Sequence, residues 1–242
     1  MPAAFRGENA EAHLRILHWN VHSWQDESGT PNVDVVVELV RDTAPDAVSL
    51  VEVDESWGAA SCLGAVAERC GYASVFVPSF EHGQQQPAAG FGNALLTKLP
   101  ISAVRQRQLV WPTTVYDGSE PSELRSVTLA KMGSFWVGST HLPRGSAEAR
   151  TAALRRLISI TEELDGAWLV CGDFNTPASS WLSGADAVVT APRPAQPTSP
   201  ANKPVAAIDY CLASLGLSLG AEVLDVNGSD HLPVLVTARG GG

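Results

Sequence analysis

Short apolar segments that stop at a carboxylate, an amide or a histidine recur along almost the whole 242-residue chain. This feature constrains the fold more than any other, because each segment has the length and composition of a β-strand. If such strands lie side by side, their ends share one rim, and we expect a pocket there to collect the polar groups. The polar residues at these ends are Asn20 with His22, Glu52, Asn93, His141, Asp173 with Asn175, Asp209, and Asp230 with His231.

Segments of helical length alternate with these strands. The expected helices cover residues 33–45, 56–72, where Gly71 is a C-terminal stop, and 146–164. The expected strands cover residues 14–21, 46–53, 74–78 and 93–98, followed by a hairpin around Gly133 and by strands leading into Asp173, containing Asp209 and following His231. Strands interspersed with helices predict a mixed α/β domain of stacked layers. We expect one domain over residues 1–242, with residues 1–13 as a flexible tail.

The charge balance restricts the possible partners. The chain has 26 acidic and 16 basic residues, for a formal net charge of −10. A strong non-specific nucleic-acid binder needs the opposite balance, because neutralising phosphates supplies most of its affinity. The composition therefore argues against a broad basic groove, although it allows a polyanionic substrate held by bound cations.

The cysteines and the N-terminus indicate the cellular compartment of the protein. Cys62, Cys70, Cys171 and Cys211 form no CxxC pair and have no zinc-like spacing with histidine. The N-terminus lacks the apolar core of a signal peptide, and no apolar run approaches the length needed to span a membrane. We therefore expect a cytoplasmic protein with reduced thiols and no transmembrane segment.

The polar strand ends suit a hard divalent cation and a phosphate. Carboxylate and amide oxygens are ligands for Mg²⁺ or Mn²⁺, which proteins usually hold through one or two carboxylates, and Glu52 fits such a role. Histidines beside a metal-bound phosphate can supply acid–base catalysis and charge stabilisation. The spacing of Asp173 and Asn175 lets both side chains point the same way from an extended segment.

Each of these residues also has an ordinary structural explanation. Asp173 and Asn175 on their own are typical of a turn, and Glu52 is typical of a solvated acidic turn. His22 lies near His13 and His18, so it can simply be a surface residue. The functional interpretation rests on the whole ordered set.

That ordered set resembles the endonuclease/exonuclease/phosphatase superfamily, which is related to deoxyribonuclease-I-like proteins. The motifs that carry the resemblance are WNVH, VE, GNALLTK, THL, GDFNTP, IDY and SDHLPV, and they span residues 14–236. The resemblance implies a four-layer α/β sandwich, in which two packed mixed β-sheets are flanked by helices. It also implies hydrolysis of a phosphoester with Mg²⁺ or Mn²⁺.

The resemblance implies roles for single residues as well. Glu52 is implied as the principal metal ligand, with Asn20 at the same metal and Asp230 beside it. His231 is implied to contact the scissile phosphate or to activate water, and Asp209 to orient this histidine.

The remaining implied roles concern the water and the phosphate. Asp173 and Asn175 position the nucleophilic water and a phosphate oxygen, and His141 stabilises charge on the phosphate or helps the leaving group. Asn93 and Arg125 match positions on the phosphate side of the site.

The sequence does not determine the substrate. The chain differs from the abasic-site endonucleases of this fold, because His22 replaces a carboxylate and His141 stands in place of a tyrosine. We favour a phosphodiester over a monoester, and the alternatives are a nuclease of the same family, a lipid or sugar phosphate hydrolase, and a non-catalytic binding protein. Loops 78–92 and 112–124 contain no Lys or Arg, which gives no sign of extended nucleic-acid contacts. Trp111 and Tyr116 are candidates for contact with a lipid surface.

Overall fold

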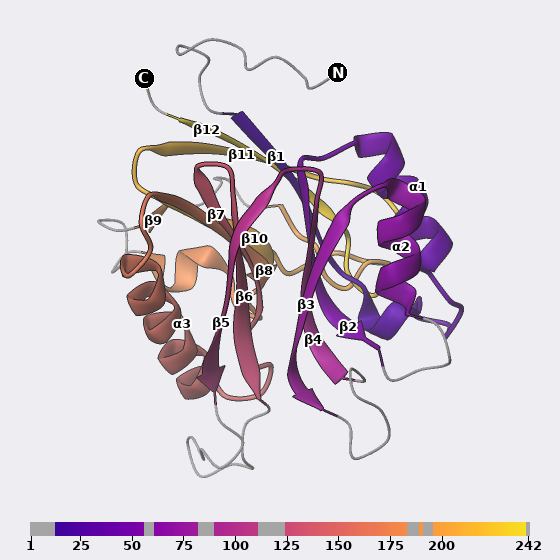
Figure 1. The fold of residues 1–242 in the computed structure, drawn as a ribbon. Helices are drawn as coiled ribbons and strands as arrows, with labels where there is room; N and C mark the ends of the chain where they lie inside the picture. The colour runs from indigo at the N-terminus through magenta and orange to yellow at the C-terminus, as the bar shows by residue number, and fades with distance from the viewer. Residues whose placement is uncertain are drawn as a thin grey trace, which may run out of the picture.

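Two six-stranded β-sheets pack face to face in the computed structural model, which describes residues 13–55, 61–81, 90–110, 124–182, 189–190 and 196–240 (Figure 1). The first sheet has the order β11 (Leu217–Val223), β12 (Val234–Gly240), β1 (His13–Asn20), β2 (Ala47–Asp54), β4 (Gly90–Thr97), β3 (Ala73–Glu81). The second has the order β5 (Ile101–Val110), β6 (Arg125–Met132), β7 (Phe135–His141), β8 (Ala167–Asp173), β10 (Asp209–Ser214), β9 (Val189–Thr190). The pairs β1–β2 and β7–β8 are parallel and the other pairs are antiparallel, so both sheets are mixed.

Helices cover the outer faces of the two sheets (Figure 1). Helices α1 (Val33–Thr43) and α2 (Cys62–Cys70) pack on the first sheet around Trp19 and Leu50. Helix α3 (Ala147–Glu162) packs on the second sheet against Trp136 and Trp168. The result is the four-layer sandwich expected from the sequence, which is therefore confirmed.

Local capping explains where these helices begin and end. The hydroxyl groups of Ser61 and Ser146 accept hydrogen bonds from the backbone N–H groups of Gly64 and Ala149, which caps the N-termini of α2 and α3. Gly71 ends α2 with a φ of 71°, as its position in the sequence predicts. Part of the expected helix 56–72 lies outside the described residues, as do residues 1–12 and the aromatic residues Trp111 and Tyr116.

Three details differ from the sequence prediction. His13, placed in the N-terminal tail by the sequence, is the first residue of β1 and pairs with Arg239. Strands β5 and β11 were not expected. Both are edge strands with many exposed residues, so their apolar pattern is weak.

The layer between the sheets changes from apolar to polar along the strands, and this change creates the site. On β1, Ile16 belongs to the apolar core, whereas His18 and Asn20, which follow on the same face, contact the second sheet through polar groups. On β8, Cys171 is in the core and Asp173 follows it. The same step runs from Val137 through Ser139 to His141 on β7, and from Cys211 to Asp209 on β10.

Two further features concern the cysteines and the helices. All four cysteines are free thiols, with Cys171 and Cys211 buried and Cys62 and Cys70 half-buried. Within the described residues, none of the helices combines the length and the apolar character that crossing a bilayer requires.

Candidate active site

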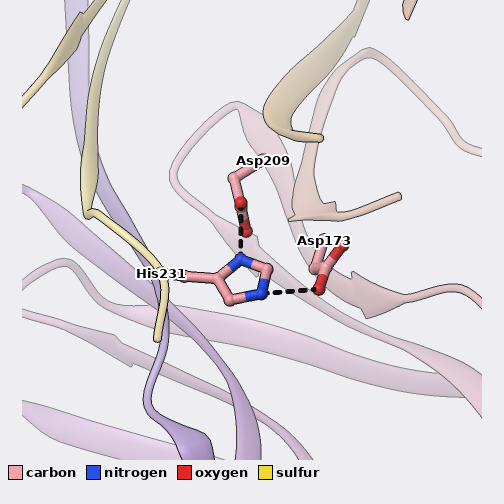
Figure 2. A group of neighbouring side chains, drawn as sticks. All are labelled: Asp173, Asp209 and His231. Atoms are coloured by element: carbon pink, nitrogen blue, oxygen red, sulfur yellow. Dashed lines mark hydrogen bonds and ion pairs between the residues drawn. The ribbon is translucent and has the colours of Figure 1, made fainter. Parts of the chain in front are cut away.

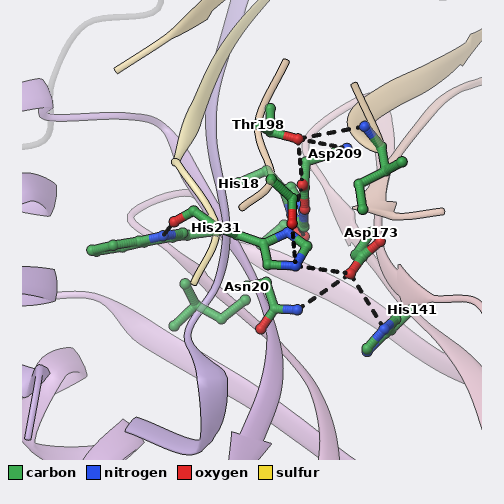
Figure 3. A network of polar contacts seen from close by, with 12 residues as sticks. His18, Asn20, His141, Asp173, Thr198, Asp209 and His231 are labelled. Carbon is green, nitrogen blue, oxygen red and sulfur yellow. Dashed lines mark hydrogen bonds and ion pairs between the residues drawn. The ribbon is translucent and has the colours of Figure 1, made fainter. Parts of the chain in front are cut away.

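A buried histidine–aspartate pair lies at the polar end of the inter-sheet layer. His231 Nδ1 lies 2.7 Å from Asp209 Oδ2, and the Thr198 hydroxyl donates a hydrogen bond of 2.6 Å to the same oxygen (Figures 2 and 3). Burial disfavours the charged imidazolium, but the negative charge of Asp209 outweighs it and raises the pKa of His231 to about 10. Burial likewise disfavours the Asp209 carboxylate, yet the His231 charge and hydrogen bonds hold its pKa below the usual range. At neutral pH the pair is an imidazolium–carboxylate ion pair.

Asp173 faces the other ring nitrogen of this histidine. Its Oδ2 lies 3.7 Å from His231 Nε2 and 3.4 Å from His141 Nε2, and it accepts a hydrogen bond of 3.3 Å from the Asn20 amide (Figure 3). Burial, together with the negative charge of Asp209 on the neighbouring strand, raises the pKa of Asp173 to about 7. Asp173 therefore binds a proton more readily than an exposed carboxyl group does.

His18 belongs to this network although the sequence did not single it out as a site residue. It is fully buried, with Nε2 3.5 Å from Asp209 Oδ1 and Nδ1 3.1 Å from the Ser49 hydroxyl. The sequence signal was its position two residues before Asn20 in a strand, which puts both side chains on one face. His22, by contrast, is half-buried in the short helix η1 (His22–Trp24), and its backbone N–H donates to Asn20 Oδ1.

His141 is kept neutral by its surroundings. The Arg125 guanidinium lies 3.2 Å from Nδ1, and the Asn175 amide nitrogen lies 3.0 Å from Nε2. Burial first and the Arg125 charge second hold the pKa of His141 well below its usual range. The Arg125 guanidinium can only donate, so it disfavours a proton on the Nδ1 atom that it faces. His141, Arg125 and Asn175 thus form a cluster of hydrogen-bonding groups on the second sheet.

Glu52 reaches the site from a distortion in the first sheet. The register between β2 and β4 shifts between Leu50 and Val53, and Glu52 in this bulge has a φ of 55°. A bulge of this kind redirects a side chain. The Glu52 carboxylate accepts a hydrogen bond of 3.1 Å from the Asn20 amide and lies 3.8 Å from His141 Nδ1.

These groups line a cleft of about 740 Å³. Of the residues predicted from the sequence, those on its wall are Glu52, Arg125, His141, Asp173, Asn175, Asp230 and His231. Asn20 and Asp209 are not on the wall, but hydrogen-bond to residues that are. Asn93 is buried and donates instead to the Ser126 carbonyl, so the structure does not bring it to the cleft.

The donor set suits a hard divalent cation. Asp173, Asp209 and His231 offer ligand atoms that all lie within 4.8 Å of one another. Asp209 and His231 Nδ1 already bind each other, whereas Glu52, Asp173 and Asp230 present carboxylate oxygens to the cleft beside them. Carboxylate oxygens without a thiolate favour Mg²⁺ or Mn²⁺ over zinc. Burial first and the negative charge of Asp209 second raise the pKa of Asp173, and a cation bound beside it would favour its charged form.

Comparisons with known proteins agree with this architecture. The model of the endonuclease/exonuclease/phosphatase family matches residues 17–231. A family protein from Bacteroides vulgatus has a TM-score of 0.75 at 17% identity, covering 95% of this chain and 99% of that chain. A mannosyl-6-phosphatase from Bacteroides thetaiotaomicron has a TM-score of 0.72 at 16% identity, covering 93% and 99%. The human Nocturnin catalytic domain, solved with a bound sulfate anion, has a TM-score of 0.65 at 17% identity, covering 94% and 96%. A search of curated proteins finds no match.

Proposed function

Because the chain belongs to the endonuclease/exonuclease/phosphatase family, whose members are phosphoester hydrolases, we propose that it is a Mg²⁺- or Mn²⁺-dependent hydrolase that cleaves a phosphodiester by in-line attack of water. The observation that carries the proposal is the ion pair of His231 and Asp209 facing Asp173 in a carboxylate-lined cleft. A cytoplasmic location stays a prediction from the sequence.

Two carboxylates on the first-sheet side hold the cation in this proposal. Glu52 and Asp230 both line the cleft, and Asn20 fixes Glu52 through its amide. A bound cation would offset negative charge on the phosphate and on the leaving oxygen.

Asp173 acts on the attacking water, and His231 acts on the phosphate. Asp173 accepts a proton from the water as the water oxygen bonds to phosphorus, and the bond from phosphorus to the leaving oxygen breaks on the opposite side. A pKa of about 7 suits this carboxylate to act as a base near neutral pH. His231, held as an imidazolium by Asp209, donates from Nε2 to a phosphate oxygen and stabilises the charge that develops there. Asp209 acts through His231, as an orienting residue.

The second-sheet cluster contacts the phosphate from the opposite side. His141, Arg125 and Asn175 line the cleft, and their mutual contacts restrict their orientations before substrate binds. Preorganised donors of this kind stabilise a pentacoordinate phosphorus at little reorganisation cost.

The acidic lining favours a compact substrate over a long nucleic acid. Glu27, Asp54 and Asp230 line the cleft in addition to the other carboxylates. Extended contacts with a polymer of phosphates would need cations at these positions.

Metal-dependent turnover tests the proposal. Wild-type protein is incubated with bis-(p-nitrophenyl) phosphate and a panel of natural esters, with Mg²⁺, with Mn²⁺ and with EDTA. We expect hydrolysis that EDTA abolishes, and losses of at least about 100-fold in Glu52→Ala and His231→Ala. Glu222→Ala, at an exposed position of β11, is the control and should match the wild type. A wild-type protein inactive on every ester would instead favour a non-catalytic binding protein.

A further inference from the structure

Apart from Asp173 at the end of β8, most carboxylates that line the cleft lie on the first-sheet side. Glu52 and Asp54 come from β2 and Asp230 from the segment before β12, all on the first-sheet side. The Arg and Lys residues on the described wall are Arg125 and Arg144, both from the second sheet and the segment that follows it. An anionic substrate that also binds a cation at Glu52 would meet these two arginines on the second-sheet side.

Arg125 belongs to the cluster that we propose binds the scissile phosphate. Its side chain is buried, and its guanidinium contacts His141. It therefore accompanies His141 and Asn175 around the scissile phosphate.

Arg144 adds a second positive charge to the side of the cleft that holds Arg125. The register pairs Val127 of β6 with Thr140 of β7, which brings the start of β6 beside the segment that follows His141. In that segment Leu142 donates a backbone hydrogen bond to the Asp173 carbonyl and accepts one from the Asn175 amide. Arg144 thus lies two residues after Leu142, whose backbone is hydrogen-bonded to Asp173 and Asn175.

The backbone of Arg144 is fixed, whereas its charge is available. Arg150 donates from Nη1 to the carbonyl oxygens of Pro143 and Arg144, at 3.3 and 2.6 Å. Among the residues that the structure describes, no carboxylate or carbonyl binds the exposed Arg144 guanidinium. Within the described part of the chain, the Arg144 guanidinium thus lies at the cleft without an acidic partner, although acidic residues outnumber basic ones by 26 to 16.

We propose that Arg144 is a specificity residue that binds a second anionic group of the substrate, separate from the scissile phosphate. This proposal rests on the proposed hydrolase function. A guanidinium binds a phosphate or carboxylate through two parallel hydrogen bonds, so it recognises both the charge and the position of that group. With a single such residue beyond Arg125 on the described wall, the preferred substrate is a short phosphodiester with one further anion.

Paired substrates test this assignment. The p-nitrophenyl ester of thymidine 5′-phosphate is compared with the same ester carrying a 3′-phosphate, which adds one anionic group and leaves the scissile bond unchanged. We expect the wild type to prefer the doubly charged ester in kcat/KM. Arg144→Gln should reduce that preference about 10-fold, mainly through KM, and Arg144→Lys should reduce it less.

Controls separate this role from general electrostatics. Arg155→Gln removes the same charge from an exposed position on α3 and should leave the preference unchanged. An equal preference in Arg144→Gln and Arg155→Gln would overturn the proposal. The proposal would also be overturned if Arg144→Gln lowered kcat/KM for p-nitrophenyl phosphate and left kcat/KM for bis-(p-nitrophenyl) phosphate unchanged. Arg144 would then bind the scissile phosphate itself.

A binding measurement keeps the two proposals distinguishable. If the wild type hydrolyses no ester, the hydrolase proposal fails, and calorimetric titration with thymidine 3′,5′-bisphosphate and thymidine 5′-phosphate still tests Arg144. Wild-type protein should bind the bisphosphate more tightly, and Arg144→Gln should lose that difference. The same difference in both proteins would contradict the role of Arg144.

Discussion

Glu52 and Asn175 share an uncommon backbone conformation, with φ angles of 55° and 51°. Non-glycine residues adopt this left-handed region at a cost of about 1 kcal/mol or more, and they persist where the surrounding structure enforces them. Both side chains line the cleft, one from each sheet. The positive φ angles therefore aim a carboxylate and an amide into one site from opposite sides.

The sequence indicates which residues stand at strand ends, but not where each side chain points. Glu52 and Asp173 could be predicted to lie near strand ends because each follows an apolar run, and His231 because an apolar run follows it. His18 was missed because its burial depends on Asp209, which lies 191 residues further along the chain. Asn93 has the same signal as Glu52, yet its amide binds a backbone carbonyl. For residues such as His18 and Asn93, tertiary contacts determine where the side chain lies, and the sequence does not show these contacts.

The His231–Asp209 pair makes stability depend on pH in a defined direction. The folded pKa of His231, about 10, exceeds its unfolded value of about 6.5. The stabilisation is therefore complete below about pH 6.5 and is lost as the pH rises toward 10. Because the folded pKa of Asp209 is lowered, its contribution is present above about pH 4 and is lost as the pH falls below that value.

We therefore expect Asp209→Asn to lower the free energy of unfolding by about 2–4 kcal/mol at pH 6, because it leaves the buried imidazolium without its counter-charge. The difference from the wild type should shrink by pH 10. Urea unfolding in EDTA at pH 6 and pH 10 measures it, with Asp225→Asn at an exposed position as the control. A pH-independent difference would show that the pair is not ionised.

At the level of elements, the close packing of β7 on β8 sets the position of the catalytic ends. The parallel register pairs Thr140 with Gly172 and His141 with Asp173. A Cβ atom on Gly172 would overlap the Thr140 carbonyl oxygen, so only glycine allows this approach. The glycine in the GDFN motif thus brings His141 and Asp173 within reach of each other.

Gly172→Ala should consequently destabilise the protein by about 1–3 kcal/mol, because two strand backbones must separate. It should also lower kcat, since Asp173 follows directly. Thermal unfolding and steady-state kinetics measure both effects. Gly220→Ala on β11 is a matched control, because its Cβ meets no atom within 4 Å. Equal stability of the two variants would refute the packing argument.

The elements that the sequence predicted well are those that contribute to the cores. Strands β1, β2 and β8 and helix α3 bury a continuous apolar face, and a buried face leaves a periodic signal. The edge strands β5 and β11 carry polar residues on exposed faces, so they lack that signal. The bulge at Glu52 has no sequence signature, since it arises from the pairing of β2 with β4.

At the scale of the whole molecule, the two sheets contribute complementary halves of one site. The first sheet supplies Glu52, and the second supplies Asp173 and His141, across an inter-sheet layer that is apolar elsewhere. Neither half contains all the groups that the proposed reaction needs. The central claim is therefore that residues from both sheets act as a unit.

A double-mutant cycle on kcat tests this claim most directly. Glu52→Gln and Asp173→Asn are measured singly and together, with bis-(p-nitrophenyl) phosphate and saturating Mn²⁺. Residues that act as a unit have strongly non-additive effects. We expect each single variant to lose at least about 100-fold in kcat, and the double variant to be within about 10-fold of the slower single variant. Losses that multiply in the double variant, or a near-wild-type rate in either single variant, would contradict the claim.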